Sequence, residues 1–201
     1  RRHPRYSPWS RGLGDVYKRQ TYHGPGQLVA YAIVDLRDIG EQPGAAARVD
    51  VATFVAALET AMIRAAAGWQ VAAGTIEGLT GIWTADGGAP PAGATAESMA
   101  GEVARGKVRK IGSIGLRVSR GVTSHGISLN LDCDLGPFDD ITSCGIDNCR
   151  PTSVLEETGS APSVTAAGSA FGRILAQEIG SDPVEVTPDE IGLSQAATPK
   201  A

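Results

Sequence analysis

The chain has 201 residues, of which 42% are hydrophobic and 20% are charged, and its formal net charge is -4. This is the length and balance of one soluble globular domain with a sizeable core, and no segment approaches the roughly 18 apolar residues of a membrane-spanning helix. We therefore expect a cytoplasmic protein with neither nucleic acid nor a membrane among its partners.

The first twenty residues differ in charge from the rest of the chain. Residues 1–20 hold six of the 18 basic residues and one of the 22 acidic residues, and such a shift marks a boundary. Residues 7–20 resemble the translated adapter sequence that contaminates assembled metagenomic reading frames. We therefore interpret residues 1–20 as a non-native segment and leave them out of the fold.

Next along the chain, residues 28–36 follow a Gly-Pro-Gly turn and predict a buried strand, because they are rich in Val, Ile, Ala and Tyr. Asp50 is a plausible N-cap for a helix whose apolar residues recur at helical spacing as far as Gly68. Apolar and polar residues alternate over 116–119 and again over 127–132, which predicts a hairpin with its turn near residues 121–125.

A Gly-, Ala- and Pro-rich run at residues 84–106 is longer than an ordinary loop. Two interpretations stay open: a flexible surface insertion, or a mobile flap beside an active site. Further on, Ser153 and Glu156 have the spacing of a capping box, and a second apolar stripe includes Phe171 and Leu175. Residues 181–201 predict a weakly ordered tail because they contain three prolines and little periodicity.

The three cysteines, Cys133, Cys144 and Cys149, lack Cys-x-x-Cys spacing, which argues against a disulfide framework and against a zinc site. Cys144 lies between Ser143 and Gly145, where small side chains let a substrate carbonyl approach and backbone N–H groups can stabilise an oxyanion. Most lone cysteines are buried packing residues, so spacing alone leaves the role of Cys144 open.

Three short segments are informative in combination: Thr-Tyr-His-Gly-Pro-Gly-Gln at residues 21–27, Arg-Lys-Ile-Gly-Ser-Ile-Gly at 109–115 and Ser-Cys-Gly-Ile at 143–146. With Ser-His-Gly at 124–126 and Leu-Asn-Leu-Asp-Cys-Asp at 129–134, they resemble the lipoyl (octanoyl) transferases. These enzymes move an octanoyl chain from acyl carrier protein onto a lysine of a lipoyl domain. The resemblance runs over residues 21–180, so we expect the catalytic domain there.

The resemblance implies a single α/β domain of the biotin and lipoate protein ligase type, a mixed sheet with helices packed on one side. It implies that Cys144 is the nucleophile and that Lys110 is its partner, which lowers the pKa of the thiol and then acts as acid and base. On pattern alone, Lys110 beside an apolar strand is a solvated edge residue. Relatives carry several dozen residues before the His-Gly-Pro-Gly-Gln turn, so we expect the domain to lack its N-terminal part.

Further residues are carried over from the same resemblance. The acyl pocket is expected to be lined by nine residues, Thr21, Tyr22, His23, Ser113, Ile114, Gly115, Gly126, Ile127 and Ser128. His125 and Asn130 are expected to orient this pocket. Cys133 and Cys149 are expected to be structural or incidental.

The implied reaction needs no cofactor and no metal, and no Gly-x-x-x-x-Gly-Lys sequence is present to bind ATP. The implied partners are octanoyl acyl carrier protein and the lipoyl domains of 2-oxoacid dehydrogenases and of the glycine cleavage H protein. Half of the basic residues beyond residue 20 lie in one 16-residue window, 105–120, which is either a solvated strand face or a docking patch for an acidic carrier.

Three other functions remain alternatives at this point. An ATP-dependent lipoate or biotin protein ligase would share the fold, a cysteine hydrolase would pass the acyl group to water, and a fragment without catalysis would bind the carrier protein only.

Overall fold

The computed structural model describes residues 22–38, 51–141, 149–187 and 189–190. Several predictions therefore concern residues outside the described ranges: those for residues 1–20, for Thr21, for the N-cap Asp50 and for Cys144. Most of the predicted tail also lies outside them.

Five strands form one sheet. They are β1 (Gln27–Tyr31), β2 (Gly74–Ile76), β3 (Leu79–Ala85), β4 (Val108–Ser119) and β5 (Val122–Asn130), in the order β1-β5-β4-β3-β2. Each neighbouring pair within the described ranges is antiparallel. Within the described residues, parallel pairing is limited to two isolated bridges, Glu77 with Thr95 and Lys110 with Pro151. The predicted α/β class is confirmed, but the sheet, which was predicted to be mixed, is antiparallel in each pair of neighbouring strands.

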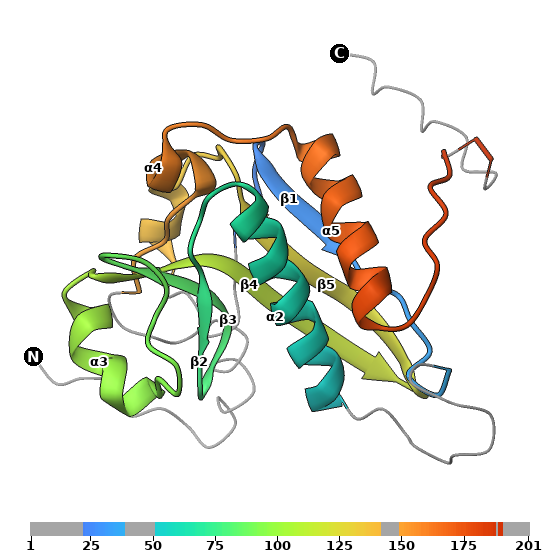
Figure 1. The fold of residues 1–201 in the computed structure, drawn as a ribbon, viewed down its shortest axis with the longest axis horizontal. Helices are drawn as coiled ribbons and strands as arrows, with labels where there is room; N and C mark the ends of the chain where they lie inside the picture. The colour runs from blue at the N-terminus through green and yellow to red at the C-terminus, as the bar shows by residue number, and fades with distance from the viewer. Residues whose placement is uncertain (1–21, 39–50, 142–148, 188, 191–201) are drawn as a thin grey trace, which may run out of the picture.

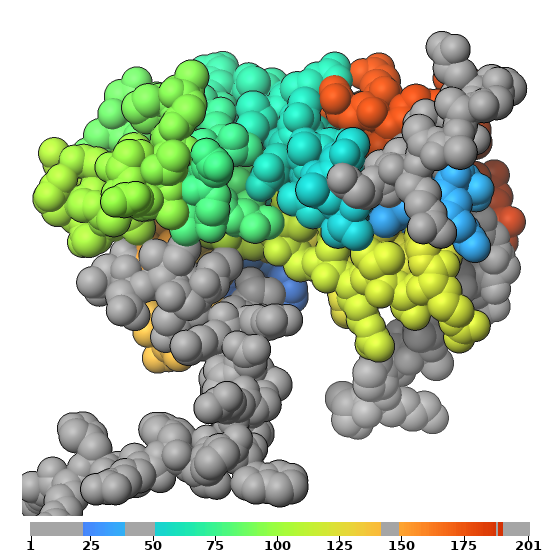
Figure 2. Space-filling view, turned by 90° about the horizontal axis from the view of Figure 1, so that it is seen from below, coloured from blue at the N-terminus to red at the C-terminus, as the bar shows by residue number. Residues whose placement is uncertain are grey.

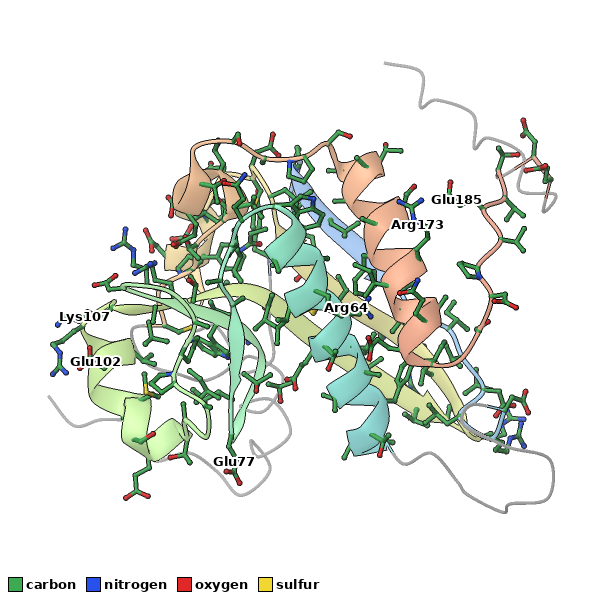
Figure 3. All side chains as sticks on the ribbon, viewed as in Figure 1. Arg64, Glu77, Glu102, Lys107, Arg173 and Glu185 are labelled. Carbon is green, nitrogen blue, oxygen red and sulfur yellow. The ribbon has the colours of Figure 1, made fainter. Side chains whose placement is uncertain are left out.

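Two long helices, α2 (Val51–Gly68) and α5 (Val164–Glu178), lie side by side across one face of the sheet (Figure 1). The predicted apolar stripes are the faces they bury, since Phe54, Leu58 and Met62 of α2 and Phe171 and Leu175 of α5 are 0 to 8% exposed. An ion pair between Arg64 and Glu178 adds a polar link between the two helices; Arg64 is labelled in Figure 3.

Helix α2 is long and apolar enough to cross a membrane by length and composition, which the sequence analysis did not anticipate. Its apolar face is instead part of the main hydrophobic cluster, together with the sheet residues Leu28, Ile82 and Leu129. Its hydrophobicity is therefore used in packing against the sheet.

Residues 84–106 contain more regular structure than their composition predicts. Helix α3 (Ala96–Ala104) begins at a capping box, in which Thr95 and Ser98 satisfy each other's backbone N–H groups. Met99 and Val103 of α3 pack into a second hydrophobic cluster around Trp83. The expected flexible insertion is thus a helix attached to the core through its own apolar face, and the signal that was overlooked is the Thr95–Ser98 spacing.

The β4–β5 hairpin is confirmed, with a tighter turn than expected. The turn consists of Arg120 and Gly121, whose φ angles of 52° and 86° are the left-handed values that a two-residue hairpin requires. Figure 1 shows the turn of this hairpin at one end of the molecule, whereas α3 lies at the other end, and Figure 2 shows the same arrangement from below.

Strand β1 is shorter than the predicted 28–36. Beyond Tyr31 the chain is held by Thr123, whose Oγ1 donates to the Ala32 carbonyl and accepts from the Val34 N–H. His125, with a φ of 65°, lies in the partner strand just beyond the last pair, Tyr31 with Gly126. Helix α4 (Val154–Thr158) has Ser153 as its N-cap. The Ser153 side chain accepts a hydrogen bond from Glu156 N, which is one of the two hydrogen bonds of the predicted capping box. A 3-10 turn spans Gly136–Asp140.

Candidate active site

Lys110 lies near the start of β4 and is only 5% exposed. Its ammonium donates to the Thr80 carbonyl at 2.8 Å and lies 5.1 Å from the centroid of the Trp83 ring. The alternative of a solvated edge lysine is therefore wrong. Burying an ammonium costs free energy unless carbonyls and aromatic faces compensate it, so a lysine held in this way is a candidate for chemistry rather than for solubility.

A bulge places Lys110 on the sheet face away from α2. Ile82 pairs with Gly112 and Trp83 pairs with Lys110, so one extra residue of β4 lies between the two pairs. Gly112 faces α2, because a Cβ there would lie 2.3 Å from Met62 Cε. Ile82 and Trp83 point to opposite faces, and Lys110 therefore shares the far face with Trp83.

Six of the nine predicted pocket residues meet as three successive cross-strand pairs of β4 and β5. These pairs are Ser113 with Ser128, Ile114 with Ile127, and Gly115 with Gly126. Because Gly112 faces α2, Ser113 and Gly115 face the opposite side, which is the side of Lys110. Among the residues that the structure describes, no atom lies within 4 Å of a Cβ built at Gly115.

Gly126 has a different role from Gly115. A Cβ at Gly126 would lie 2.1 Å from the Ala30 carbonyl oxygen and 2.9 Å from Ala32 N. The missing side chain lets β1 approach β5 closely, so Gly126 is needed for packing of the edge strand whether or not it touches a substrate.

His23 is tied to the sheet by a buried chain of amides. Its Nδ1 lies 2.6 Å from Gln27 Oε1, Gln27 Nε2 donates to Asn130 Oδ1 at 2.7 Å, and Asn130 Nδ2 donates to the Thr152 carbonyl at 2.8 Å. Gln27 and Asn130 are each 5% exposed and Thr152 is fully buried. Both amides have acceptors and donors at these distances, so the chain fixes the His23 turn against β5.

The remaining predicted pocket residues lie in the same turn or outside the described residues. The Tyr22 ring packs edge-on against Phe138, with 5.5 Å between the ring centroids. Gly24 makes room for it, since a Cβ there would lie 2.1 Å from the Tyr22 hydroxyl oxygen. Thr21, the third predicted pocket residue of this segment, falls outside the described residues.

His125 and Asn130, which were expected to orient the pocket together, lie in different surroundings. Asn130 is buried in the amide chain, whereas His125 is exposed and its ring stands edge-on to Tyr31 at 5.9 Å. Of the two, Asn130 is therefore the one connected to a predicted pocket residue, since Gln27 joins it to His23.

Residues 150–152 run beside Lys110. Lys110 N donates to the Arg150 carbonyl and Thr152 N donates to the Lys110 carbonyl, both at 2.9 Å. Thr152 Oγ1 also donates to Glu157 at 2.7 Å, and Glu157 pairs with Arg109 at 2.9 Å. The segment that follows the Ser-Cys-Gly-Ile sequence is thus bonded to the backbone of the candidate acid and base.

The described cysteines differ from a reactive thiol. Cys133 is 6% exposed, and burial raises the pKa of its thiol, with the neighbouring charges of Asp132 and Asp134 acting in the same direction. A raised pKa lowers the thiolate fraction at neutral pH, as a structural residue requires. Cys149 is half-buried, and Cys144 falls outside the described residues.

Much of the basic window at residues 105–120 is neutralised within the chain. Arg105 pairs with Glu102 at 2.5 Å, and Lys107 lies 3.9 Å from the same carboxylate; Glu102 and Lys107 meet at one end of the molecule in Figure 3. Arg109 pairs with Asp86 and Glu157, and hydrogen bonding to Glu157 raises the pKa of its guanidinium above the ordinary value. These ion pairs leave less positive charge at residues 105–109 for a docking patch than the sequence alone predicts.

Three residues of the site were missed by sequence reasoning. Gln27 closes the His-Gly-Pro-Gly-Gln turn and its position in that motif is a signal that could have found it. Thr152 and Glu59, which accepts a hydrogen bond from Gly81 N at 2.9 Å, have no local signal because each acts on a strand far away in the sequence.

Neither of two surface hollows, of about 260 and 310 Å³, is lined by Lys110 or by the predicted pocket residues. One lies beside Trp69 and Pro162, and the other lies between Asp86 and α3. Within the part of the chain that the structure describes, no group of three or more His, Cys, Asp or Glu residues is placed to hold a metal ion.

Residues 19–176 match the family described as lipoyl protein ligase A/B catalytic domain. An octanoyltransferase of Acidobacterium capsulatum is 36% identical over 191 residues, which are 91% of this chain and 69% of the relative. One of Salinispora arenicola is 38% identical over 184 residues, 88% of this chain and 75% of the relative. One of Mycobacterium sp. (strain KMS) is 42% identical over 139 residues, but these are only 48% of its length.

Solved structures show the same fold at low identity. The chain superimposes on a lipoate-protein ligase A bound with ATP with a TM-score of 0.52 and 16% identity, covering 84% of this chain and 59% of that one. It superimposes on the biotin protein ligase of Aquifex aeolicus in complex with biotin and ATP with a TM-score of 0.51 and 10% identity, covering 77% and 50%. The likeness concerns the fold alone.

Proposed function

The chain belongs to the octanoyltransferases of the lipoyl protein ligase A/B catalytic domain family, and we propose that it transfers octanoyl groups through a thioester on Cys144 with Lys110 as acid and base. As an octanoyltransferase it is an acyltransferase of lipoate biosynthesis. The acyl donor is an acyl carrier protein and the acceptor is a lipoyl domain.

In the first step of this mechanism, the Cys144 thiolate attacks the carbonyl carbon of the carrier's octanoyl thioester. A new carbon–sulfur bond forms, the carrier's thiol leaves as thiolate, and the Lys110 ammonium supplies its proton. In the second step, a lysine amine of the lipoyl domain attacks the enzyme thioester, Lys110 takes a proton from that nitrogen, and the Cys144 sulfur leaves. An amide is the product.

The energetics of this sequence need no nucleotide. The donor is already a thioester, so the first step exchanges one thioester for another with little change in free energy. The second step converts a thioester into an amide and runs downhill. We propose that both steps take place in the cytoplasm, and that the acceptors are lipoyl domains of 2-oxoacid dehydrogenases and the glycine cleavage H protein.

One observation carries the proposal: a buried lysine is held on the sheet face that carries the predicted pocket residues of β4. Lys110 is 5% exposed and shares its face with Ser113 and Gly115, two of the residues expected to line the acyl chain. Arg150, six residues after Cys144 in the sequence, is bonded to the Lys110 backbone. This hydrogen bond supports the proposal that Cys144 acts beside Lys110.

Intact-protein mass spectrometry tests the proposal. After incubation with octanoyl acyl carrier protein, we expect one added octanoyl group, on the peptide that contains Cys144 and removed by hydroxylamine. The matched control is Cys133→Ala, which removes a buried thiol and leaves the adduct in place.

An adduct that survives Cys144→Ala, or that maps to Cys133 or Cys149, contradicts the assignment. Release of free octanoate without an acceptor lipoyl domain identifies a hydrolase instead. Octanoylation that requires ATP and proceeds without Cys144 identifies a ligase.

A further inference from the structure

One peptide group connects Lys110 to a carboxylate on the core helix. The Thr80 carbonyl accepts from Lys110 Nζ at 2.8 Å, and the N–H of the same peptide, that of Gly81, donates to Glu59 Oε1 at 2.9 Å. Glu59 is half-buried on α2, 22 residues before Gly81. The Lys110 ammonium therefore binds the C=O of this peptide group, and the Glu59 carboxylate binds its N–H.

The backbone at Gly81 is shaped around Lys110. Gly81 has a φ of 106°, which L side chains rarely adopt. A Cβ there would lie 2.4 Å from the Gly112 carbonyl oxygen and 2.9 Å from Lys110 Cε. A side chain at this position would thus displace Lys110 as well as strain the backbone. Because Gly81 has no side chain, the lysine side chain can pass beside it.

A glycine peptide needs an anchor if it is to hold an ammonium in place. Glycine gives the chain more conformational freedom than any other residue, and a lysine side chain has several rotatable bonds. A hydrogen bond from an amide to a carboxylate is about twice as strong as one between neutral groups, and linked hydrogen bonds polarise one another. Glu59 supplies such an anchor from α2, whose apolar face is fixed in the core.

We infer that Glu59 is a positioning residue for Lys110: by fixing the Thr80–Gly81 peptide, it sets where the ammonium lies relative to the acyl group. The inference rests on the proposed function, in which Lys110 acts on the reacting atoms. Glu59 thus acts on Lys110 through the peptide.

Kinetics of paired variants test the inference. Glu59→Ala removes the acceptor, and because small displacements of a catalytic group are costly, kcat should fall about ten- to a hundredfold with little change in KM. Glu59→Gln keeps an oxygen that accepts from Gly81 N, so it should restore kcat to within about threefold of the wild-type enzyme. Thermal unfolding of both variants checks that each is folded.

A glycine pair provides the matched backbone control. Gly81→Ala should reduce kcat as severely as Lys110→Ala does. Gly93→Ala introduces the same methyl at another left-handed position, with φ 77° and no atom within 4 Å of the new Cβ, and should leave kcat unchanged. Equal effects of the two substitutions would show that backbone strain rather than the contact with Lys110 matters, and would overturn the inference.

Chemical labelling reports the position of Lys110 without relying on activity. Brief acetylation followed by peptide mass spectrometry compares Lys110 with Lys107, whose side chain is 55% exposed and serves as the internal reference. Glu59→Ala should raise the ratio of Lys110 to Lys107 labelling several-fold, and Glu59→Gln should return it to the wild-type ratio.

The outcomes separate the two proposals. If Glu59→Ala leaves both kcat and the labelling ratio unchanged, the positioning role is refuted. If Glu59→Gln behaves like Glu59→Ala, the charge of Glu59 matters rather than its grip on the peptide, and the inference is again refuted. If the labelling ratio responds as expected but Lys110→Ala retains full transfer, the positioning holds and the proposed function of Lys110 fails.

Discussion

Gln27 and Asn130 join the two ends of the candidate site through a buried hydrogen bond. Gln27 Nε2 donates to Asn130 Oδ1 at 2.7 Å, and the two residues are 103 positions apart in the chain. Gln27 also meets His23, and Asn130 also donates to the Thr152 carbonyl. One pair of amides therefore connects the His-Gly-Pro-Gly-Gln turn to the segment that runs beside Lys110.

Asn130→Ala should destabilise the fold by roughly 2–5 kcal/mol, because it removes the acceptor of the buried Gln27 Nε2 and the side-chain donor to the buried Thr152 carbonyl. Urea unfolding of the variant and the parent gives the difference. Gln177→Ala is the control, since Gln177 is an exposed amide bonded to Arg64 at 3.2 Å, and its truncation should cost less than about 0.5 kcal/mol. Similar losses in both variants would show that the buried chain adds nothing.

Lys110→Ala should slow octanoyl transfer by roughly the 10²–10⁴-fold typical of a lost acid and base. The thiolate of Cys144 should also form at higher pH, because a neighbouring cation favours the charged form of a thiol. The rate of Cys144 alkylation as a function of pH measures this directly. Identical profiles in the variant and the parent would rule out charge pairing between the two residues.

The Arg109–Glu157 pair predicts a loss of stability in acid. Burial alone would raise the pKa of Glu157, but hydrogen bonds from Arg109 and Thr152 outweigh it, so the folded-state pKa lies below the ordinary 4.5. A lowered carboxyl pKa contributes stability that is fully present above the unfolded pKa and is lost as pH falls through the folded pKa.

Glu157→Gln should therefore be less stable than the parent at pH 7, by about 1–3 kcal/mol, and this difference should shrink below about pH 4. Unfolding at a series of pH values measures it. Glu97→Gln, on an exposed position of α3, should show a much smaller difference at every pH. If the difference in free energy of unfolding between Glu157→Gln and the parent does not shrink in acid, the lowered pKa of Glu157 is contradicted.

Patterns within single elements predicted much of the fold. The stripe from Phe54 to Met62 and the stripe containing Phe171 and Leu175 predicted the two core helices, because a helix repeats its buried face every three to four residues. The alternation around Leu116 and Leu129 predicted the hairpin. Elements whose bounds depend on tertiary contacts were less predictable: β1 ends at Tyr31, and Thr123 of the neighbouring strand holds the residues that follow through its side chain.

The candidate site was predictable only where a resemblance identified its residues. Ser113 and Ser128 become cross-strand partners through the register of the hairpin, which local alternation does not set uniquely. The burial of Lys110 depends on the bulge between β3 and β4, and Glu59 reaches its peptide from a helix 22 residues away. No pattern of neighbouring residues contains such information.

Gly115 and Gly126 face each other across β4 and β5, and alanine at the two positions should have opposite effects. Gly126→Ala places a methyl 2.1 Å from the Ala30 carbonyl, so β1 must shift, and the free energy of unfolding should fall by about 3 kcal/mol or more. Gly115→Ala meets no atom within 4 Å and should leave stability nearly unchanged. If the acyl chain lies on this face, however, the new methyl occupies its place, and the KM for octanoyl carrier protein should rise while the fold stays intact. Thermal unfolding and steady-state transfer, measured on both variants, check the two effects separately. A Gly115→Ala enzyme with normal stability and normal kinetics would mean that the acyl chain binds elsewhere.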